Sequence, residues 1–321
     1  MDLPLLFELL LVLAFLVIMC AAWCTACAVG VACAVGGAAT QVAQRPVSPR
    51  TILWPSAGPA SSRIATLGRT IARAAMRRGE FGPPSPRAAA DIRRAAAEVA
   101  AAESAADSAA ATPADEKKAR DALTSVYQTE VTLAAQRIRP RATDLPDGLL
   151  TADDIIAAAQ QRRVPAAALL AVARAAEQVA KGDFAAVYEA DLSSRVHQMR
   201  VQAAAAAFED AVAARLTELG AGAYQREDEI RAAAIAAGTT APLTPDFLFK
   251  EPILLNGQLI YWLDAKNYYW YGSPLTARSV ARQAEKYTHA FGPGAFVFRY
   301  GADPAAPVGA GAGAIPPLIL M

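Results

Sequence analysis

The segment from Thr244 to Lys266 constrains the fold most, because it has the pattern of two apolar strands joined by a tight turn. Asn256-Gly257 lies between the apolar runs, and this dipeptide is the strongest short signal of a β-hairpin, since both residues tolerate positive φ. Aromatic and aliphatic side chains fill both arms, as buried strands favour. The sequence therefore predicts a largely buried hairpin.

Three charged residues mark the open end of this hairpin. Asp246 opens the first strand, and Asp264 and Lys266 close the second, two positions apart and hence on one face. Carboxylates there are costly to bury without a partner, and their oxygens suit Mg²⁺. We therefore expect Asp246 and Asp264 to hold Mg²⁺ (or Mn²⁺) while Lys266 positions a water or offsets transition-state charge. The alternative is a turn residue at Asp246 and a surface ion pair at the other two.

The strand register conflicts with this arrangement unless the first strand is irregular. A two-residue turn pairs Leu255 with Gln258, and counting outward puts Phe247, not Asp246, opposite Lys266. Strict alternation then places Asp246 on the other face of the sheet. We expect either a bulge, with the proline of the first strand as its position, or an Asp246 that precedes the strand and bends inward.

Pro245-Asp246 followed by Asp264-Ala265-Lys266 resembles the signature of the PD-(D/E)XK nucleases. From about Phe208 to Gly301 the chain more specifically resembles the TPD-motif family of codanin-interacting nucleases, whose members usually carry Glu where Asp264 stands. Four segments carry this resemblance: Thr244-Pro245-Asp246, Trp262-Leu263-Asp264-Ala265-Lys266, Gln283 with Tyr287, and Phe291-Gly292-Pro293-Gly294. The resemblance implies a restriction-endonuclease-like αβββαβ core, metal-dependent cleavage of nucleic acid, and a codanin-like protein partner.

The resemblance also implies roles for further polar residues. Glu209 lies on the helix predicted from about 195 to 219, and by its distance before the hairpin it resembles the acid that completes the metal shell. Glu227 competes with it, because it begins an E-x-x-[LI]-R run similar to one in the family. The alternative for each is an exposed helix acid. Gln283 and Tyr287 share a helix stripe and resemble the family's glutamine motif behind the lysine.

The segment after the hairpin contains candidates for nucleic-acid binding. Residues 267–275 form an aromatic loop, which is suited either to stacking on unpaired bases or to packing under the site. On the helix expected over 276–290, three cations step by four and suit successive phosphates: Arg278, Arg282 and Lys286. Tyr287 on the adjacent stripe is added to this nucleic-acid-binding set. A last strand is predicted over 295–300.

The N-terminal segment has the pattern of a membrane anchor. Residues 9–44 carry no charge, and residues 9–39 are long and apolar enough for a spanning helix. Arg45 and Arg50 follow at once, which predicts a single-pass protein whose C-terminal bulk is cytosolic. The alternative is a soluble nuclear or cytoplasmic protein with a buried helix. All four cysteines lie between residues 20 and 33, which leaves no disulfide framework for the rest of the chain.

Composition divides the chain into five parts. They are a hydrophobic segment (1–44), a partly disordered basic Pro/Ser/Arg-rich linker (45–87), an Ala-rich helical region (88–194), the nuclease-like α/β domain (195–303) and a Gly/Ala/Pro-rich tail (304–321). In the helical region Thr151 and Asp154 form a capping-box pattern. We expect a helix from there to Arg163 and a second from Ala166 to about Lys181, compatible with a helix-turn-helix.

The sequence thus predicts a metal-dependent nuclease domain behind a helical region and an N-terminal anchor. The net charge of +1 does not indicate a partner. Two other classes of protein fit the same pattern. One is a non-catalytic nucleic-acid- or partner-binding protein on a nuclease-like fold, and the other is a membrane-anchored helical scaffold whose C-terminal domain serves for docking.

Overall fold

The computed structural model describes residues 49–54, 62–106, 110–239, 243–303, 305–306 and 318–319. All of these belong to one compact unit, Pro49–Met321. The predicted anchor at 9–44 and the four cysteines lie outside these ranges, so membrane anchoring stays a prediction. No helix within the ranges is both long and apolar enough to cross a membrane.

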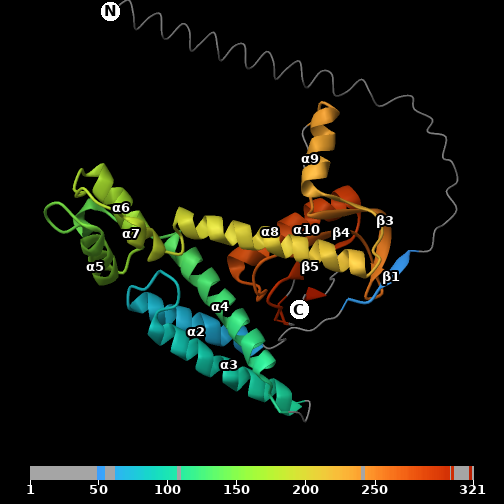
Figure 1. Ribbon diagram of the computed structural model, residues 1–321, viewed down its shortest axis with the longest axis horizontal. Coiled ribbons are helices and arrows are strands. Elements are labelled where there is room, and N and C mark those ends of the chain that lie inside the picture. The colour runs from blue at the N-terminus through green and yellow to red at the C-terminus, as the bar shows by residue number, and fades with distance from the viewer. Residues whose placement is uncertain are drawn as a thin grey trace, which may run out of the picture. The chain divides into compact units, whose positions relative to one another are not determined.

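A six-stranded mixed sheet forms the C-terminal part of the protein (Figure 1). Its main path runs β1 (Arg50–Ile52), β3 (Phe247–Leu255), β4 (Gln258–Lys266), β5 (Gly294–Phe298) and β6 (Leu318–Ile319), and β2 (Tyr224–Arg226) also pairs with β3. The strands β2 and β4 run antiparallel to β3, whereas β1–β3, β4–β5 and β5–β6 are parallel pairs. The protein is therefore a mixed α/β protein, and its sheet extends beyond the predicted domain start at residue 195.

The predicted hairpin is confirmed, and its turn has the expected conformation. Asn256 and Gly257 have φ angles of 48° and 81°, and Leu255 pairs with Gln258. Positive φ at both central residues is the condition that favours Asn-Gly in a two-residue hairpin turn.

The irregularity expected in β3 is also present. The register shifts between the pairs Leu248–Trp262 and Ile253–Ile260, so five steps along β3 oppose two along β4. The two counts differ by an odd number, so the alternation of side chains along β3 is offset by one residue at the shift. Residues of β3 before the shift therefore point to the opposite face from the one that strict alternation predicts. Phe247 consequently pairs with Leu263, and the next position outward sets Asp246 opposite Asp264.

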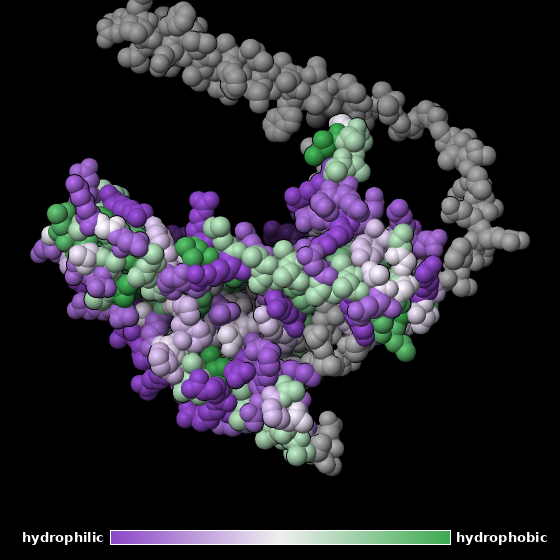
Figure 2. Space-filling view, viewed as in Figure 1, coloured by the Kyte–Doolittle hydropathy of each residue, from purple (hydrophilic) through white to green (hydrophobic). Residues whose placement is uncertain are grey.

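Two helices cover opposite faces of the sheet (Figure 1). α8 (Arg195–Glu218) packs Phe208, Val212 and Leu216 against one face. α10 (Pro274–Phe291) packs against the other face, where Trp262, Phe296 and Phe298 lie. The outer face of α8 forms an apolar band in Figure 2 because alanines occupy it. Both helices were predicted, and α8 ends before Gly220, whose φ is 68°.

Part of the predicted linker is folded, which corrects that prediction. Residues 62–77 form helix α2 (Ser62–Arg77), whose apolar positions Ile64, Gly68, Ile71 and Ala75 follow helical spacing and are buried. With α3 (Pro86–Ala106) and α4 (Pro113–Ala135), this helix forms a bundle with its own core. The many arginines of α2 lie on its outer side. They dominate the composition of this segment, so the composition did not reveal the apolar stripe of the helix.

The aromatic loop after β4 enters this bundle, which decides between its two alternatives. Tyr269 and Tyr271 belong to the bundle core, and the backbone N–H of Tyr269 donates to Ser125 Oγ over 2.8 Å. The Tyr271 hydroxyl donates to Glu130 Oε1 over 2.7 Å. The loop therefore packs into the core of the bundle, and its rings are not available to stack on bases. It connects the bundle to the end of β4, just beyond Lys266.

A second helical group follows the bundle. It consists of η1 (Ala142–Asp144), α5 (Ala152–Arg162), α6 (Ala166–Ala175) and α7 (Ala185–Glu189). The predicted capping box is confirmed, since Thr151 and Asp154 exchange hydrogen bonds at the start of α5. α6 ends well before Lys181, because the chain turns at Glu177 with a φ of 57°.

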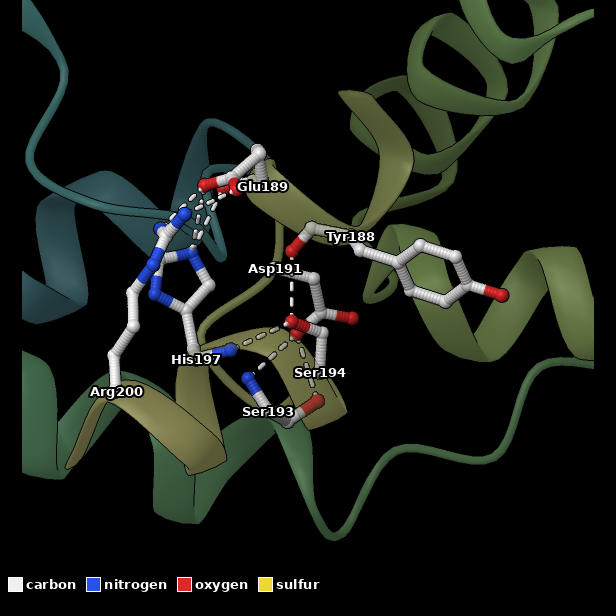
Figure 3. Close-up of polar contacts among 7 residues, drawn as sticks. All are labelled: Tyr188, Glu189, Asp191, Ser193, Ser194, His197 and Arg200. Carbon is white, nitrogen blue, oxygen red and sulfur yellow. Dashed lines mark hydrogen bonds and ion pairs between the residues drawn. The ribbon is translucent and has the colours of Figure 1, made fainter. Parts of the chain in front are cut away.

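A buried polar network joins this group to α8 (Figure 3). Asp191 is fully buried, and its Oδ2 accepts from the backbone N–H of Ala167 at the start of α6. Ser194 caps α8 and donates its hydroxyl to the carbonyl of Tyr188. The other members of the network are Glu189, Ser193, His197 and Arg200. α8 is thereby anchored at its first turn to the helical group and at its last turns to the sheet.

Candidate active site

Two aspartates lie together at the open end of the hairpin, and one is half-buried and the other buried. Asp246 lies just before β3, and its Oδ2 accepts from the backbone N–H of Ala265 over 2.6 Å. Asp264 lies on β4 with 2% of its surface exposed. The register shift in β3 and this backbone contact bring the two carboxylates to the same place, as the sequence predicted. The ordinary alternative of a surface ion pair at Asp264 is excluded by its burial.

Asp264 is held by two side chains. Its Oδ2 accepts from Gln283 Nε2 of α10 over 2.8 Å, and its Oδ1 forms a close ion pair with Lys266 Nζ. The ammonium of Lys266 also lies 5.5 Å from the ring centroid of Phe296. Lys266 thus lies beside Asp264, whereas Gln283, which was expected to support the lysine, contacts the acid instead.

Burial and like charge together raise the pKa values of both aspartates. For Asp246, burial and then the Asp264 carboxylate raise the pKa to about 8. Burial also raises the pKa of Asp264, against the opposing effect of the Lys266 ammonium. The pair therefore holds a proton near neutral pH when nothing positive lies between the carboxylates.

Two glutamates are close enough to the aspartate pair for their charges to affect it, and each of them lies beside an arginine. Glu209 on α8 stands 3.9 Å from Arg226, and burial raises its pKa while Asp264 adds to that effect. Glu227 at the start of α9 (Glu227–Ala236) pairs with Arg231. Among the described residues no group of three His, Cys, Asp or Glu side chains is close enough to hold a metal ion. Neither glutamate completes a three-ligand set here, so the choice between them stays open.

The two aspartates nevertheless fit the requirements of Mg²⁺. This cation is commonly held by one or two carboxylates, with waters and substrate phosphates filling its octahedral shell. Asp264 Oδ1 is a buried oxygen whose one partner is the Lys266 ammonium, with which it forms an ion pair but no hydrogen bond of good geometry. A cation between the carboxylates would also relieve the repulsion that raises their pKa values. Asp246 and Asp264 are therefore the residues that would hold it, and the charge of Glu209 acts on Asp246 while that of Glu227 acts on Asp264.

A hydrogen-bond chain from α10 supports the site, and it corrects one predicted role. Tyr287, predicted to bind nucleic acid, has only 6% of its surface exposed. Its hydroxyl accepts from Gln283 Nε2 over 3.0 Å and donates to the carbonyl of Thr244 over 3.0 Å. Tyr287 therefore links Gln283, which orients Asp264, to the segment that carries Asp246. The packing of its ring against Trp262 leaves no face for a base.

The cations predicted to track phosphates lie on the exposed side of α10. Arg278, Arg282 and Lys286 are all exposed, whereas Gln283 and Tyr287 turn toward the sheet. The three form no ion pair with any carboxylate in the described part of the chain. Their spacing and exposure are those of a phosphate-binding stripe or of a solvated helix face.

The Phe291-Gly292-Pro293-Gly294 segment holds Trp262 beside the site. The indole N–H of Trp262 donates to the carbonyl of Gly292 over 2.9 Å, and Trp262 pairs with Gly294 across β4 and β5. A Cβ on Gly294 would lie 2.0 Å from Cε2 of that indole. Glycine is therefore required at position 294, because the ring of Trp262 approaches the backbone there. Trp262 lies two residues before Asp264.

Comparison with known proteins gives one family for the part of the chain that contains these residues. A family model described as a protein of unknown function with the TPD sequence motif matches residues 175–304. Residues 175–304 match the TPD family. Every predicted site residue lies within this TPD segment. The description of the family assigns it no activity.

One curated relative shares part of the chain. The uncharacterized protein L539 of Acanthamoeba polyphaga mimivirus is 50% identical over 64 residues, which cover 19% of this chain and 23% of that protein. The chain thus spans about a quarter of the relative's length. No solved structure matches the chain.

The TPD segment contains two contacts near the candidate site that the sequence did not reveal. The Thr244 hydroxyl donates to Glu227 Oε1 over 2.8 Å, so the threonine of the motif connects Asp246 to α9. Arg226 lies beside Glu209 and pairs with Asp210. Arg226 directly precedes the acidic run that begins at Glu227, and this adjacency was the available signal for a neutralising cation.

Because Asp246 and Asp264 hold a proton near neutral pH, the free energy of unfolding of the metal-free protein should depend on pH. Because the folded-state pKa of Asp246 is about 8 and its ordinary value is 3.8, the folded protein binds more protons than the unfolded chain between these limits. The free energy of unfolding should therefore fall as pH rises from about 5 to 8 and level off above that. Urea unfolding in EDTA at several pH values measures this. Asp246→Asn should flatten the slope, and a stability that rises over this range would contradict the assignment.

Proposed function

We propose that the protein is a metal-dependent nuclease that hydrolyses phosphodiester bonds. The observation that carries the proposal is the convergence of Asp246, Asp264 and Lys266 at one end of the hairpin, with Asp264 buried, Asp246 half-buried and the pKa values of both acids raised. Groups with strongly perturbed pKa values in contact with a lysine are typical of catalytic sites. The order α8, β2, α9, β3, β4, α10, β5 contains the expected αβββαβ series with one additional helix after β2, and it supports a relation to the PD-(D/E)XK nucleases.

Each residue has a role that follows from its contacts. Asp246 and Asp264 hold the divalent cation, which when bound polarises the phosphoryl group and acidifies its water. Lys266 lies beside Asp264 and places positive charge where a phosphodiester would gain negative charge in its transition state. Gln283 fixes the orientation of the Asp264 carboxylate, and Tyr287 fixes that of Gln283.

Cleavage of defined substrates by the full chain tests this function. Labelled single-stranded DNA, duplex DNA, a flap substrate and RNA should be incubated with Mg²⁺, Mn²⁺ or EDTA. We expect cleavage of at least one substrate with a divalent cation and none with EDTA. Binding without cleavage of all four, in both metals, would instead support a non-catalytic nucleic-acid-binding protein on the same fold.

The exposed cations of α10 predict a measurable electrostatic contribution to binding. Replacing Arg278, Arg282 and Lys286 together with alanine should weaken binding of every nucleic acid and lower the slope of log K against log salt by up to about three. Fluorescence anisotropy in EDTA at several salt concentrations measures this. The matched control is alanine at three exposed arginines of α3 and α4: Arg87, Arg93 and Arg120. Equal slopes for both triple variants would make the stripe a solvated helix face.

A further inference from the structure

A groove on the helical part of the protein is surrounded by arginines. It has a volume of about 370 Å³ and lies where the end of α2 meets the end of α4 and the turn between α5 and α6. Arg73, Arg77 and Arg163 line it, over a floor that includes Met76 and Ile138. The lining contains no carboxylate. All of these residues lie outside the segment that matches the TPD family.

The three arginines are exposed and have no carboxylate partner in the described part of the chain. Four further arginines that do not line the groove are likewise exposed without such a partner. Arg162 precedes Arg163, and the other three lie near the lining residue Ile138 in sequence: Arg137, Arg139 and Arg141. Arginines in the last turn of a helix also stabilise its dipole, and α2 and α5 each end on one. One cation per helix serves that purpose, whereas α2 contributes two to the groove, Arg73 and Arg77.

The backbone holds the sides of the groove together. Gly79 follows α2 with a φ of 80°, and a Cβ there would lie 2.2 Å from the carbonyl oxygen of Gln160 in α5. The neighbouring chain is fixed by the hydrogen bond from Leu192 N–H to the Phe81 carbonyl. Arg77 and Arg163, each within three residues of this contact, are therefore kept in the lining of one groove by close backbone packing.

We propose that this arginine groove, defined by Arg73, Arg77 and Arg163, is a second nucleic-acid-binding site that contacts the phosphate backbone. The guanidinium group matches phosphate oxygens in bidentate geometry, and an open surface with several unpaired cations suits a ligand whose charge repeats along its length. The half-buried Met76 and Ile138 give a sugar or base an apolar surface. The proposal rests on the proposed function, because it takes nucleic acid to be the substrate, and it adds a contact away from the aspartate pair.

Binding measured without turnover tests the site. The full chain, in EDTA, is titrated with a labelled 30-nucleotide oligo(dT) and a 30-base-pair duplex at several salt concentrations. Changing Arg73, Arg77 and Arg163 together to glutamine should weaken binding about tenfold or more at moderate salt and lower the salt slope by up to about three. Lysine at the same positions should restore most of the slope, which separates loss of charge from loss of fold. The triple alanine variant of Arg87, Arg93 and Arg120 controls for total charge.

The outcomes distinguish this site from the nuclease function. An unchanged affinity and slope in the glutamine variant would overturn the arginine groove, even if the wild-type protein cleaves nucleic acid. A reduced slope together with no cleavage in any metal would support the groove while the proposed function fails. If poly-glutamate competes for the groove as well as oligo(dT) of equal charge does, an acidic protein is the ligand and the nucleic-acid proposal is overturned.

Discussion

Asp264→Asn is expected to lower the rate of phosphodiester cleavage by about a hundredfold or more, as is typical when a metal ligand or an electrostatic stabiliser is lost. The amide cannot supply the negative charge that a cation and Lys266 both require, although it keeps the size of the side chain. Asp246→Asn and Lys266→Ala should have comparable effects. Single-turnover cleavage with saturating Mg²⁺ measures the chemical step.

The fold should survive these changes. Burial raises the pKa of Asp264, so a neutral amide at this position removes a costly charge and Gln283 remains as its partner. Asp228→Asn is the matched control, because Asp228 is an exposed acid at the start of α9. Circular dichroism and the unfolding midpoint verify the folded state. Undiminished cleavage by any two of the three site variants would refute the catalytic assignment.

Gly294→Ala is expected to destabilise the protein by at least about 3 kcal/mol, or to prevent folding. The added methyl group would lie 2.0 Å from the indole of Trp262, which has 1% of its surface exposed. Neither the strand backbone nor the enclosed ring can move away without breaking the pairing of β4 with β5. Urea unfolding followed by tryptophan fluorescence measures the change.

Gly182→Ala provides the comparison for this effect. No heavy atom lies within 4 Å of a Cβ built at Gly182, so alanine there should change the free energy of unfolding by less than about 0.5 kcal/mol. A Gly294→Ala variant as stable as the Gly182→Ala variant would show that Trp262 is not held against the turn. The explanation given for the Phe291–Gly294 segment would then be wrong.

The features that the sequence predicted well are those set by local chemistry. The Asn256-Gly257 turn, the Thr151 cap and the ends of α8 each depend on a few neighbouring residues. The contact between Asp264 and Lys266 was predicted for the same reason, since the two residues are two apart on one strand. The conflict in register also had a local cause, because β3 contains an irregularity between Leu248 and Ile253.

The features that the sequence did not predict depend on contacts between distant parts of the chain. Tyr269 is buried because its partner Ser125 comes from a helix 144 residues earlier. β1 pairs with β3 although about two hundred residues separate them, as Thr51 opposite Leu254 shows. Tyr287 was predicted to bind nucleic acid, but it lies on the side of α10 that packs against the sheet. Helical spacing predicts which residues share a stripe with Tyr287, but it does not predict which stripe contacts the sheet.

The central claim is that Asp246 and Asp264 hold one divalent cation together, and the calorimetric titration of the full chain with Mn²⁺ tests it most directly. Because the pair shares a proton near neutral pH, binding at pH 7 should release protons, detected as a heat that varies with the ionisation enthalpy of the buffer. We predict saturable binding of one Mn²⁺ with proton release, lost in Asp246→Asn and in Asp264→Asn and retained in Asp228→Asn. Binding that is absent from the wild-type protein, or that persists unchanged when both aspartates are replaced, would contradict the claim.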